Sequence, residues 1–435
     1  MRQANNQTSR KTAADNHNTV ENVLVLQGGG SLGAFACGVF KAITNYNIKL
    51  DIIAGTSIGG INAAIMAGSK DKNHPEKSLE GFWSELSEGF VDLGKVVSPP
   101  NSMPEYVEKF LQLTSAAYMH DGASASSTFG EKNSLSNMQS KQHDEKMRQF
   151  RSFYSSAIFG NAKMFKPRWI QETALSDPEF FTPQNWTYIY DHTPLLKTLE
   201  NYIDYNRLKP DGNPNSRLIL TAVNILNAEP LTFDSSNEQI TPQHILATSA
   251  YPLYNFRWAE VKKGIYSWDG SLLSNTPLRE VIDASPVNDK RIFIVENYPK
   301  KVGLLPRNLP EVYHRARDIM FSDKTEHNIA MSKVITMYLK YIDELYQLIE
   351  KHVDFSKVDK DQLKKIRHKY KKIKHERGAE IKDILYITRD EPFPHMYENA
   401  DFSPQTIKAS IREGETKTVE ILNRRQGQGY TNRAN

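Results

Sequence analysis

The clearest pattern along the chain is an alternation of short apolar runs with helical stripes over residues 23–68. The runs "VLVLQ" (residues 23–27) and "LDIIAGTS" (residues 50–57) have the length of buried strands. The segments after them, residues 34–46 and 58–68, place apolar or small residues at helical spacing. Strand, helix, strand and helix within about fifty residues predict parallel pairing in an α/β layered fold.

The same style returns later in the chain. "RLILTAVNIL" (residues 217–226) and "RIFIVENY" (residues 291–298) predict two more strands. Between them, "TPQHILATSA" (residues 241–250) predicts a helix with Thr241 as its N-cap and Pro242 at its first position. We therefore expect one α/β domain over residues 21–310.

The C-terminal third has a different pattern, which predicts a helical extension over residues 311–423. Its apolar residues recur at spacings of three and four and form one stripe: Ile335, Leu339, Ile342, Leu345, Ile349 and Val353. Polar composition predicts a disordered arm at residues 1–20 and a tail at 424–435. The polar segment 115–150 is interpreted as an insertion, either a passive surface loop or a lid over a lipid pocket.

Composition narrows the class of protein. The formal net charge of the 435 residues is only +4, which argues against bulk binding of nucleic acid. The single cysteine, Cys37, excludes an intramolecular disulfide and fits a reducing compartment. We see no secretory h-region in residues 1–20 and no apolar run near the ~18 residues of a membrane span, so we expect a cytoplasmic protein whose membrane contact is peripheral.

Charge is nevertheless concentrated in one place. Lys357–Arg377 holds ten Lys or Arg against three acids, a local net of +7. Two interpretations stay open: a solvated basic helix, or a surface that docks on anionic membrane lipid.

The first chemical signal is the run Gly28-Gly29-Gly30-Ser31-Leu32-Gly33, between a predicted strand and helix. Consecutive glycines let several backbone N–H groups turn toward one point, and the helix N-terminus adds partial positive charge. Such a loop suits a phosphate or the oxyanion of acyl transfer. A dinucleotide site would need an acid at the end of the second strand, but Asp51 stands at its start. A Walker loop is excluded, since no Lys-Ser/Thr follows the glycines.

The second signal is Gly55-Thr56-Ser57-Ile58-Gly59, a G-x-S-x-G pattern between the second strand and second helix. This is the pattern of a nucleophile elbow, in which Gly55 and Gly59 relieve crowding and the serine is raised to the edge of the sheet. Ser57 is therefore the candidate nucleophile.

The third signal concerns the base that takes the serine proton. None of the twelve histidines lies in a setting typical of that role. Asp269 stands in "WDGS" (residues 268–271), after an apolar and aromatic lead-in, where an Asp-Gly pair by itself is also typical of a simple turn. Burial against Trp268 and Tyr266 is expected to raise its pKa toward a useful range. The aromatic segment Thr248–Trp258 is interpreted as lining an acyl pocket or as ordinary core.

Together these segments resemble the patatin-like phospholipases. The resemblance is carried by "VLQGGGSLGAFACGVF", "GTSIGGINAA", "ATSAYPLYNF" and "WDGSLLSNTPL", which follow one another in the order of that family. It implies a three-layer α/β/α fold with a mostly parallel sheet and hydrolysis of fatty acyl esters. It also implies a Ser57–Asp269 dyad without histidine and an oxyanion hole formed by the loop of Gly28, Gly29, Gly30, Ser31 and Gly33.

The chain departs from the family pattern at two positions. Leu32 stands where many relatives have Lys or Arg, so a charge near the glycine loop is missing, and Ser271 stands where Gly or Ala is usual. Near the C-terminus, "ADFSPQTIKASIREGE" is similar to an extension of some bacterial members. The expected partner is a membrane lipid or lipid ester, and neither a cofactor nor a metal ion is expected.

Three alternatives stay open. An ordinary α/β-hydrolase would complete a triad with His314 or His327, although that fold places several strands before its elbow. An acyltransferase of the same family would pass the acyl group to an acceptor other than water. A non-catalytic lipid-binding protein would need neither Ser57 nor Asp269.

Overall fold

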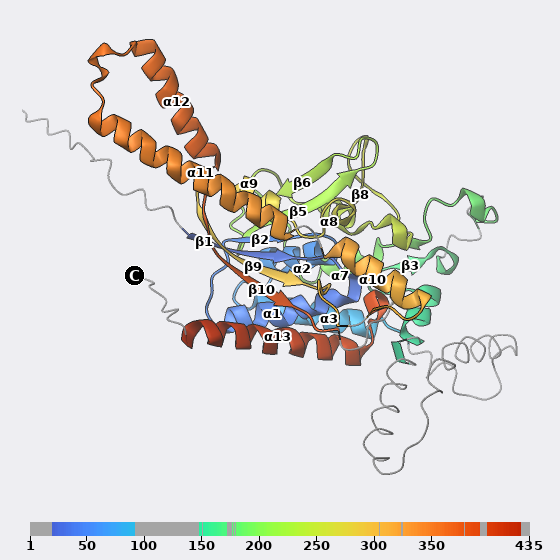
Figure 1. Cartoon of the computed structure of the whole chain (residues 1–435). Coiled ribbons are helices and arrows are strands. Elements are labelled where there is room, and N and C mark those ends of the chain that lie inside the picture. The colour runs from blue at the N-terminus through green and yellow to red at the C-terminus, as the bar shows by residue number, and fades with distance from the viewer. Residues whose placement is uncertain are drawn as a thin grey trace, which may run out of the picture.

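The computed structural model describes residues 20–91, 148–149, 151–171, 176, 178, 180–303, 305–322, 325–377, 379–391 and 398–427. The predicted arm at 1–20 and insertion at 115–150 lie almost wholly outside these residues. Figure 1 shows a central sheet between helical layers, with a long helical hairpin projecting from one side.

The core of the fold is a sheet of eight strands whose order is β10-β9-β1-β2-β5-β8-β7, with β6 also paired to β5. The strands are β1 Val20–Leu26, β2 Ile52–Gly55, β5 Arg217–Asn224, β6 Pro230–Asp234, β7 Ala259–Lys262, β8 Ile265–Asp269, β9 Asp289–Glu296 and β10 Ile381–Thr388. From β10 to β5 neighbouring strands are parallel, whereas β6, β7 and β8 are antiparallel to their partners. The expectation of a mixed α/β fold with a mainly parallel sheet is thus confirmed. A separate small ladder joins β3 (Lys166–Pro167) to β4 (Tyr190–Asp191).

Helices cover both faces of the sheet because its central strands are apolar on both sides. In β1, Leu24 and Leu26 pack into one apolar cluster, and Val23 and Val25 into another on the opposite face. The first face is covered by α1 Ala34–Asn45, α2 Ile58–Gly68, α3 Pro75–Glu88, α7 Pro194–Leu199, α8 Pro242–Ser249 and α13 Pro404–Gly427. The second is covered by α9 Leu278–Ala284 and the start of α11 Thr325–His352. Thr241 caps α8 as predicted, in a capping box with His244.

The C-terminal extension is not purely helical, which corrects the expectation for residues 311–423. It supplies strand β10, which pairs with β9 at the edge of the sheet. Its last helix, α13, crosses α1 very closely: an added Cβ at Gly38 would lie 1.8 Å from the Ile411 carbonyl oxygen, and one at Gly414 would lie 2.1 Å from that of Phe35. Only glycine permits this approach. The extension is therefore part of the same packed body as the α/β elements.

The projecting hairpin consists of α11 and α12 (Lys360–Arg377), with α10 (Leu309–Phe321) just before it. The two helices meet through stacked rings of Tyr346 and Tyr370 and an Arg367–Glu350 ion pair of 2.8 Å. The predicted apolar stripe lies on α11 except for Val353, which follows its last residue, and Ile335, Ile342, Leu345, Ile349 and Val353 are all exposed. In the part of the chain that the structure describes, no helix has both the length and the apolar character required to cross a membrane.

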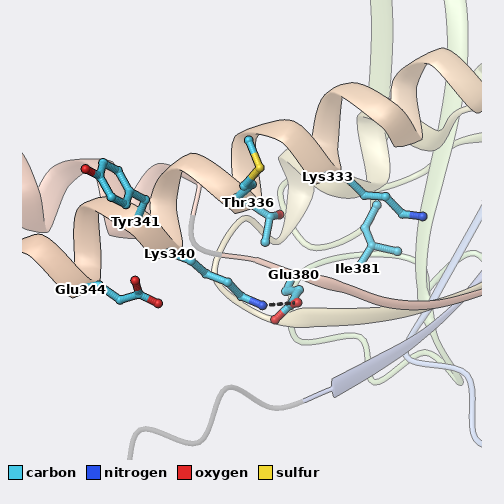
Figure 2. A pocket seen from close by; sticks show the side chains of 8 residues that line it. Lys333, Thr336, Lys340, Tyr341, Glu344, Glu380 and Ile381 are labelled. Carbon is cyan, nitrogen blue, oxygen red and sulfur yellow. Dashed lines mark hydrogen bonds and ion pairs between the residues drawn. The ribbon is translucent and has the colours of Figure 1, made fainter.

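A hollow of about 560 Å³ lies between α11 and the start of β10 (Figure 2). Lys340 of α11 reaches across to Glu380, with 2.6 Å between Nζ and Oε1. None of the site residues predicted from the sequence lines this hollow.

Candidate active site

Ser57 stands on a strained turn between β2 and α2, as the elbow pattern predicts. Its φ is 57° and its ψ −131°, and α2 begins at the next residue. A non-glycine residue in this region costs on the order of 1–3 kcal/mol, which the surrounding packing must supply. An added Cβ at Gly55 would lie 2.2 Å from the Gly59 carbonyl oxygen, and one at Gly59 would lie 2.5 Å from that of Leu26. Both glycines are thus required by the tight crossing of β1, β2 and α2.

The glycine loop lies directly beside the serine, since it follows β1 and Leu26 is in register with Gly55 of β2. Gly29 and Gly30 have φ of 155° and 60° and line the same pocket as Ser57. The amide of Gly28 is already engaged, donating to Asn275 Oδ1 at 3.0 Å. Gly33 packs against Ile58 and Trp83 instead of facing the pocket.

Ser31 links the loop to a distant part of the chain. Its buried hydroxyl donates to the Glu398 carbonyl oxygen at 2.7 Å. Next to it, an added Cβ at Gly30 would lie 2.4 Å from the Asn399 carbonyl oxygen, and Asn399 Nδ2 donates to the Gly29 carbonyl at 3.2 Å. The loop is therefore clamped between the elbow and the segment that follows β10.

Asp269 is the last residue of β8 and is fully buried. It is opposite Ala222 of β5, and β5 lies beside β2, so the sheet brings the strand ends of Asp269 and Ser57 to one edge. Thr221 of β5 joins the two sides: its hydroxyl is 2.7 Å from that of Thr56, and an added Cβ at Gly270 would lie 2.5 Å from it.

The two oxygens of the Asp269 carboxyl group differ. Oδ1 accepts from the Ser271 amide at 2.8 Å and the Ser271 hydroxyl at 2.7 Å. Oδ2 accepts no hydrogen bond from any described residue. Burial raises the pKa of Asp269 to about 6, against the opposing effects of the Ser271 amide and the Ser57 and Ser271 hydroxyls. The Ser57 hydroxyl is thus near enough to stabilise the carboxylate, although the two do not form a hydrogen bond of ordinary geometry.

The raised pKa agrees in direction with the sequence expectation, but its assigned neighbours were wrong. Side chains alternate along a strand, so Tyr266 and Trp268 point away from the face that carries Asp269. Tyr266 is also 37% exposed. The charge of Asp269 instead contributes to raising the pKa of Tyr251 and Tyr254, which follow α8.

Ser57, Gly29 and Gly30 open on a pocket of about 610 Å³. Most of its lining is apolar, including Phe153, Met164, Phe165, Leu195, Phe321 and Phe402. The aromatic segment after α8 contributes Tyr251, Leu253, Tyr254 and Phe256, so this segment lines the pocket that contains Ser57, and its role in binding an acyl chain stays a prediction. A cavity of this size, with a mainly apolar surface and polar side chains at some positions, is typical of a site for a small or lipid-like ligand.

The model of the family described as patatin-like phospholipase matches residues 24–282, more than half of the chain. The chain belongs to this family. The match contains the glycine loop, the elbow and the Asp269 segment, and ends before α10.

Two curated members of the group match short stretches. A triacylglycerol lipase, SDP1L of Arabidopsis thaliana, is 38% identical over 63 residues, which are 14% of this chain and 8% of that protein. The lysophospholipase nte1 of Aspergillus terreus is 50% identical over 48 residues, 11% of this chain and 3% of that protein. The chain therefore matches only a small part of either relative's length.

Solved structures give weaker similarities. VipD from Legionella pneumophila aligns over 93% of this chain and 67% of its own, with 16% identity and a TM-score of 0.35. The type III effector ExoU aligns over 94% of this chain and 54% of its own, with 12% identity and a TM-score of 0.28. At these identities and TM-scores, neither similarity supports a conclusion about this chain.

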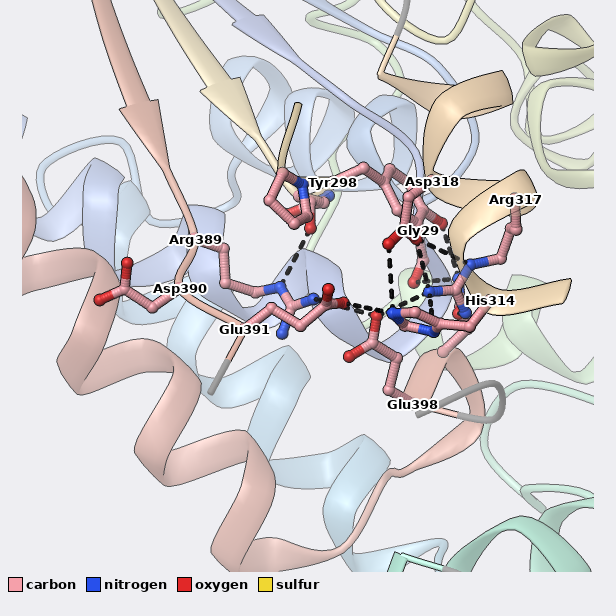
Figure 3. Close-up of polar contacts among 12 residues, drawn as sticks. Gly29, Tyr298, His314, Arg317, Asp318, Arg389, Asp390, Glu391 and Glu398 are labelled. Carbon is pink, nitrogen blue, oxygen red and sulfur yellow. Dashed lines mark hydrogen bonds and ion pairs between the residues drawn. The ribbon is translucent and has the colours of Figure 1, made fainter. Parts of the chain in front are cut away.

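A buried cluster of charges lies behind the glycine loop (Figure 3). Arg317 Nη2 is 2.8 Å from both Asp318 Oδ1 and Glu398 Oε1. Arg389 Nη2 is 3.0 Å from Glu398 Oε1 and 3.2 Å from Glu391 Oε1. Because Glu398 and Asn399 also contact the loop, this cluster connects α10 and the segment after β10 to the candidate oxyanion site.

His314 completes the cluster, and with Asp318, Glu391 and Glu398 it forms a set of possible metal ligands. Its Nε2 lies 2.9 Å from Glu391 Oε1 and 3.1 Å from Asp318 Oδ2. Burial lowers the pKa of His314, but the two carboxylates outweigh it and raise the value to about 9. Arg317 Nη2 at 3.0 Å from Nδ1 instead favours a neutral ring that accepts at Nδ1.

Both forms of the ring keep a hydrogen on Nε2, so this atom has no lone pair for a metal ion. Two guanidinium groups, those of Arg317 and Arg389, already contact all three carboxylates. The donor set therefore fits an ion network better than a metal site. The sequence pattern did not indicate the cluster, because its residues on α10 and its residues after β10 are more than seventy positions apart in the chain.

The histidines of the alternative triad are placed elsewhere. His314 belongs to the charge cluster and does not line the pocket, and His327 is exposed on α11. The histidine that does line the pocket is His192, whose Nε2 is 3.0 Å from the Leu246 carbonyl oxygen. Sequence reasoning also gave no role to the polar lining residues Asn275, Tyr298 and Asn399. Asn275 lies within the quoted segment "WDGSLLSNTPL", whereas no local motif marks Tyr298 or Asn399.

Proposed function

We propose that this protein is a lipid acyl hydrolase, of the phospholipase A or carboxylester type, with Ser57 as nucleophile and Asp269 as base. The observation that carries the proposal is the pairing of two unusual groups. A serine on a strained elbow faces an apolar pocket, and beside it lies a buried carboxyl group with one oxygen that accepts no hydrogen bond from the described residues. Family membership supports the same reaction class.

Asp269 is suited to the role of base by its environment. With a pKa of about 6 it is ionised at neutral pH, yet far more basic than a solvent-exposed aspartate. Ser271 fixes Oδ1, which leaves Oδ2 to accept the Ser57 proton as Ser57 attacks the ester carbonyl carbon. The protonated Asp269 then returns this proton to the leaving alcohol.

The negative charge of the tetrahedral intermediate needs hydrogen-bond donors. We assign them to the backbone amides of Gly29, Gly30 and Ser31, since the Gly28 amide is occupied by Asn275. Each such donor contributes roughly 3–4 kcal/mol to the stability of the transition state. In the second half-reaction Asp269 takes a proton from water, which attacks the acyl-enzyme and releases the fatty acid.

The acceptor in that second step distinguishes two activities. Water gives a hydrolase, whereas a lipid hydroxyl in its place gives the acyltransferase alternative. Chromatography of the products from a labelled phospholipid, with and without added lysophospholipid or monoacylglycerol, separates them: free fatty acid alone supports the hydrolase.

The basic stretch Lys357–Arg377, almost all of it on α12, stays a prediction of contact with anionic lipid. Flotation with vesicles of increasing anionic content tests it, because electrostatic docking must strengthen with that content and weaken with salt.

The experiment that tests the proposed reaction is hydrolysis of a medium-chain p-nitrophenyl ester by the purified protein, compared with Ser57→Ala and Asp269→Asn. Turnover by the wild type alone supports the dyad. His327→Ala must keep its activity, because His327 is exposed on α11. His314→Ala should lose activity only together with stability, because His314 belongs to the charge cluster. A loss of activity without a loss of stability in either variant would favour a histidine triad. Equal activity of wild type and Ser57→Ala would show that another residue is the nucleophile.

A further inference from the structure

Helix α10 has its polarity reversed relative to an ordinary surface helix. At 100° per residue, six apolar positions fall on one face about 120° wide: Leu309, Val312, Tyr313, Ala316, Ile319 and Met320. The five large side chains among them are 46–69% exposed. The opposite face carries His314 and Asp318, which are 3% and 0% exposed.

The buried charges fix this orientation. His314, Arg317 and Asp318 are held by Glu391, Glu398 and Arg389 in the cluster of Figure 3. Rolling α10 to bury its apolar face would expose or separate these pairs, and breaking a buried pair is strongly unfavourable. The buried ion pairs on the opposite face of α10 therefore keep its apolar face exposed.

The outward face is continuous with the pocket. Tyr313, Ala316 and Met320 belong to the face and also line the pocket that contains Ser57. Leu253, 65% exposed, lines the same pocket from the segment after α8. An acyl chain moving from the outside of α10 into the pocket would pass along Tyr313, Ala316 and Met320.

We propose that the α10 face is the surface by which the protein docks on a lipid bilayer and draws its substrate into the pocket. This inference rests on the proposed function, since it assigns the surface from which the acyl substrate comes. The occupant is a lipid surface because the face carries no charged residue and leads into an apolar cavity beside the nucleophile. An amphipathic helix of this kind lies in the interface with its apolar side among the acyl chains.

Docking through the apolar α10 face can be distinguished by experiment from docking through the basic stretch Lys357–Arg377. The tip of the α11–α12 hairpin projects far from α10 (Figure 1). Contact through α10 depends on apolar burial, so zwitterionic vesicles suffice and salt has little effect. Contact through α12 requires anionic lipid.

The test uses the full chain carrying Ser57→Ala, so that vesicles of phosphatidylcholine are not hydrolysed. Val312→Gln/Ile319→Gln replaces two exposed residues of the face that do not line the pocket. In a vesicle sedimentation assay, we expect this variant to have a partition coefficient at least tenfold lower than that of the Ser57→Ala parent. The matched control, Met337→Gln/Leu348→Gln, replaces two apolar residues of α11 that are at least as exposed, and it should bind as the parent does.

A second readout separates this inference from the proposed function. In the wild-type background, Val312→Gln/Ile319→Gln should hydrolyse a soluble short-chain ester at the parent rate but phosphatidylcholine vesicles at least tenfold more slowly. Absence of ester hydrolysis by the parent would count against the proposed function only, because vesicle binding by the Ser57→Ala protein still decides the docking surface.

Several outcomes would overturn the docking surface. These are failure of the parent to bind zwitterionic vesicles, equal loss of binding in the α11 control, or unchanged binding of the α10 variant. A change of molecular mass in light scattering on α10 substitution would instead identify the face as a contact between copies of the chain. Val312→Leu/Ile319→Leu, which keeps the apolar face, must retain binding.

Discussion

The glycine loop beside Ser57 is held from two sides, and the two sides are built differently. On one side, β2, α2 and β8 hold the loop, Ser57 and Asp269 through short local motifs and close backbone packing. On the other side, α10 and the segment after β10 hold it through buried charges that meet across long stretches of sequence. In the proposed function the first side supplies the reacting groups, whereas the second supplies position and, as we propose, access from the membrane.

The difference has an energetic consequence. Backbone packing at Gly55 and Gly59 tolerates no side chain at all, so the first side fails through steric overlap. The charge cluster tolerates size changes better but not the loss of one partner, since the remaining charge stays desolvated. Substitutions on the two sides should therefore differ in how strongly they change the rate of ester hydrolysis relative to the free energy of unfolding.

The largest effect is expected from Asp269→Asn, which should reduce ester hydrolysis about 10⁴-fold. The same change should stabilise the protein at neutral pH. The folded pKa of about 6 lies above the ordinary value of 3.8, so the native state binds more protons between these values. Wild-type stability therefore falls as pH rises from about 4 to about 6, by up to about 3 kcal/mol in all.

Thermal unfolding of Asp269→Asn and wild type at pH 4 and pH 8 checks this sign. The variant should melt higher at pH 8, and its advantage should disappear at pH 4. Ser57→Ala is the control, because it removes activity and leaves the buried carboxyl group in place. Equal melting of Asp269→Asn and wild type at pH 8 would contradict the raised pKa.

On the other side of the loop, Glu398→Gln should destabilise the fold by about 3 kcal/mol. Glu398 accepts from Arg317 and Arg389, and its backbone carbonyl accepts from Ser31. We expect kcat to fall because the loop amides lose their support, while the pH at which activity is half-maximal stays unchanged because Asp269 is untouched. A shifted pH profile with unchanged stability would argue that the cluster acts on the base instead.

The two sides also differ in how far the sequence could predict them. Elbow, glycine loop and Asp269 segment lie within one family match, and each is a local pattern whose neighbouring strand or helix can be read from apolar runs. The charge cluster has no local sequence pattern. In the sequence, His314 and Asp318 look like ordinary polar residues of a helix, and only the folded structure places Glu391 and Glu398 next to them. The sequence pattern also failed to predict strand β10, because "IKDILYIT" is short and follows a long helical region.

A smaller effect is expected from Ser271→Ala, which acts on the base alone. The Ser271 hydroxyl donates to Asp269 Oδ1 at 2.7 Å and favours the carboxylate. Without it the pKa of Asp269 should rise, so the acid limb of the pH–rate profile should move up by roughly half to one pH unit. Activity at pH 8 should change little. Movement of the limb to lower pH would show that this hydroxyl does not stabilise the ionised base.

The smallest effect is expected far from the loop, at the Lys340–Glu380 pair between α11 and β10. Its distance of 2.6 Å is as short as any in the buried cluster, but the Lys340 side chain is 60% exposed. Water and salt screen such a pair, so Lys340→Ala should cost less than about 1 kcal/mol, against about 3 kcal/mol for Glu398→Gln. Denaturant unfolding measures both. A comparable loss from Lys340→Ala would mean that the hairpin is as tightly coupled to the sheet as the charges behind the glycine loop, and that burial is not what separates the two kinds of ion pair.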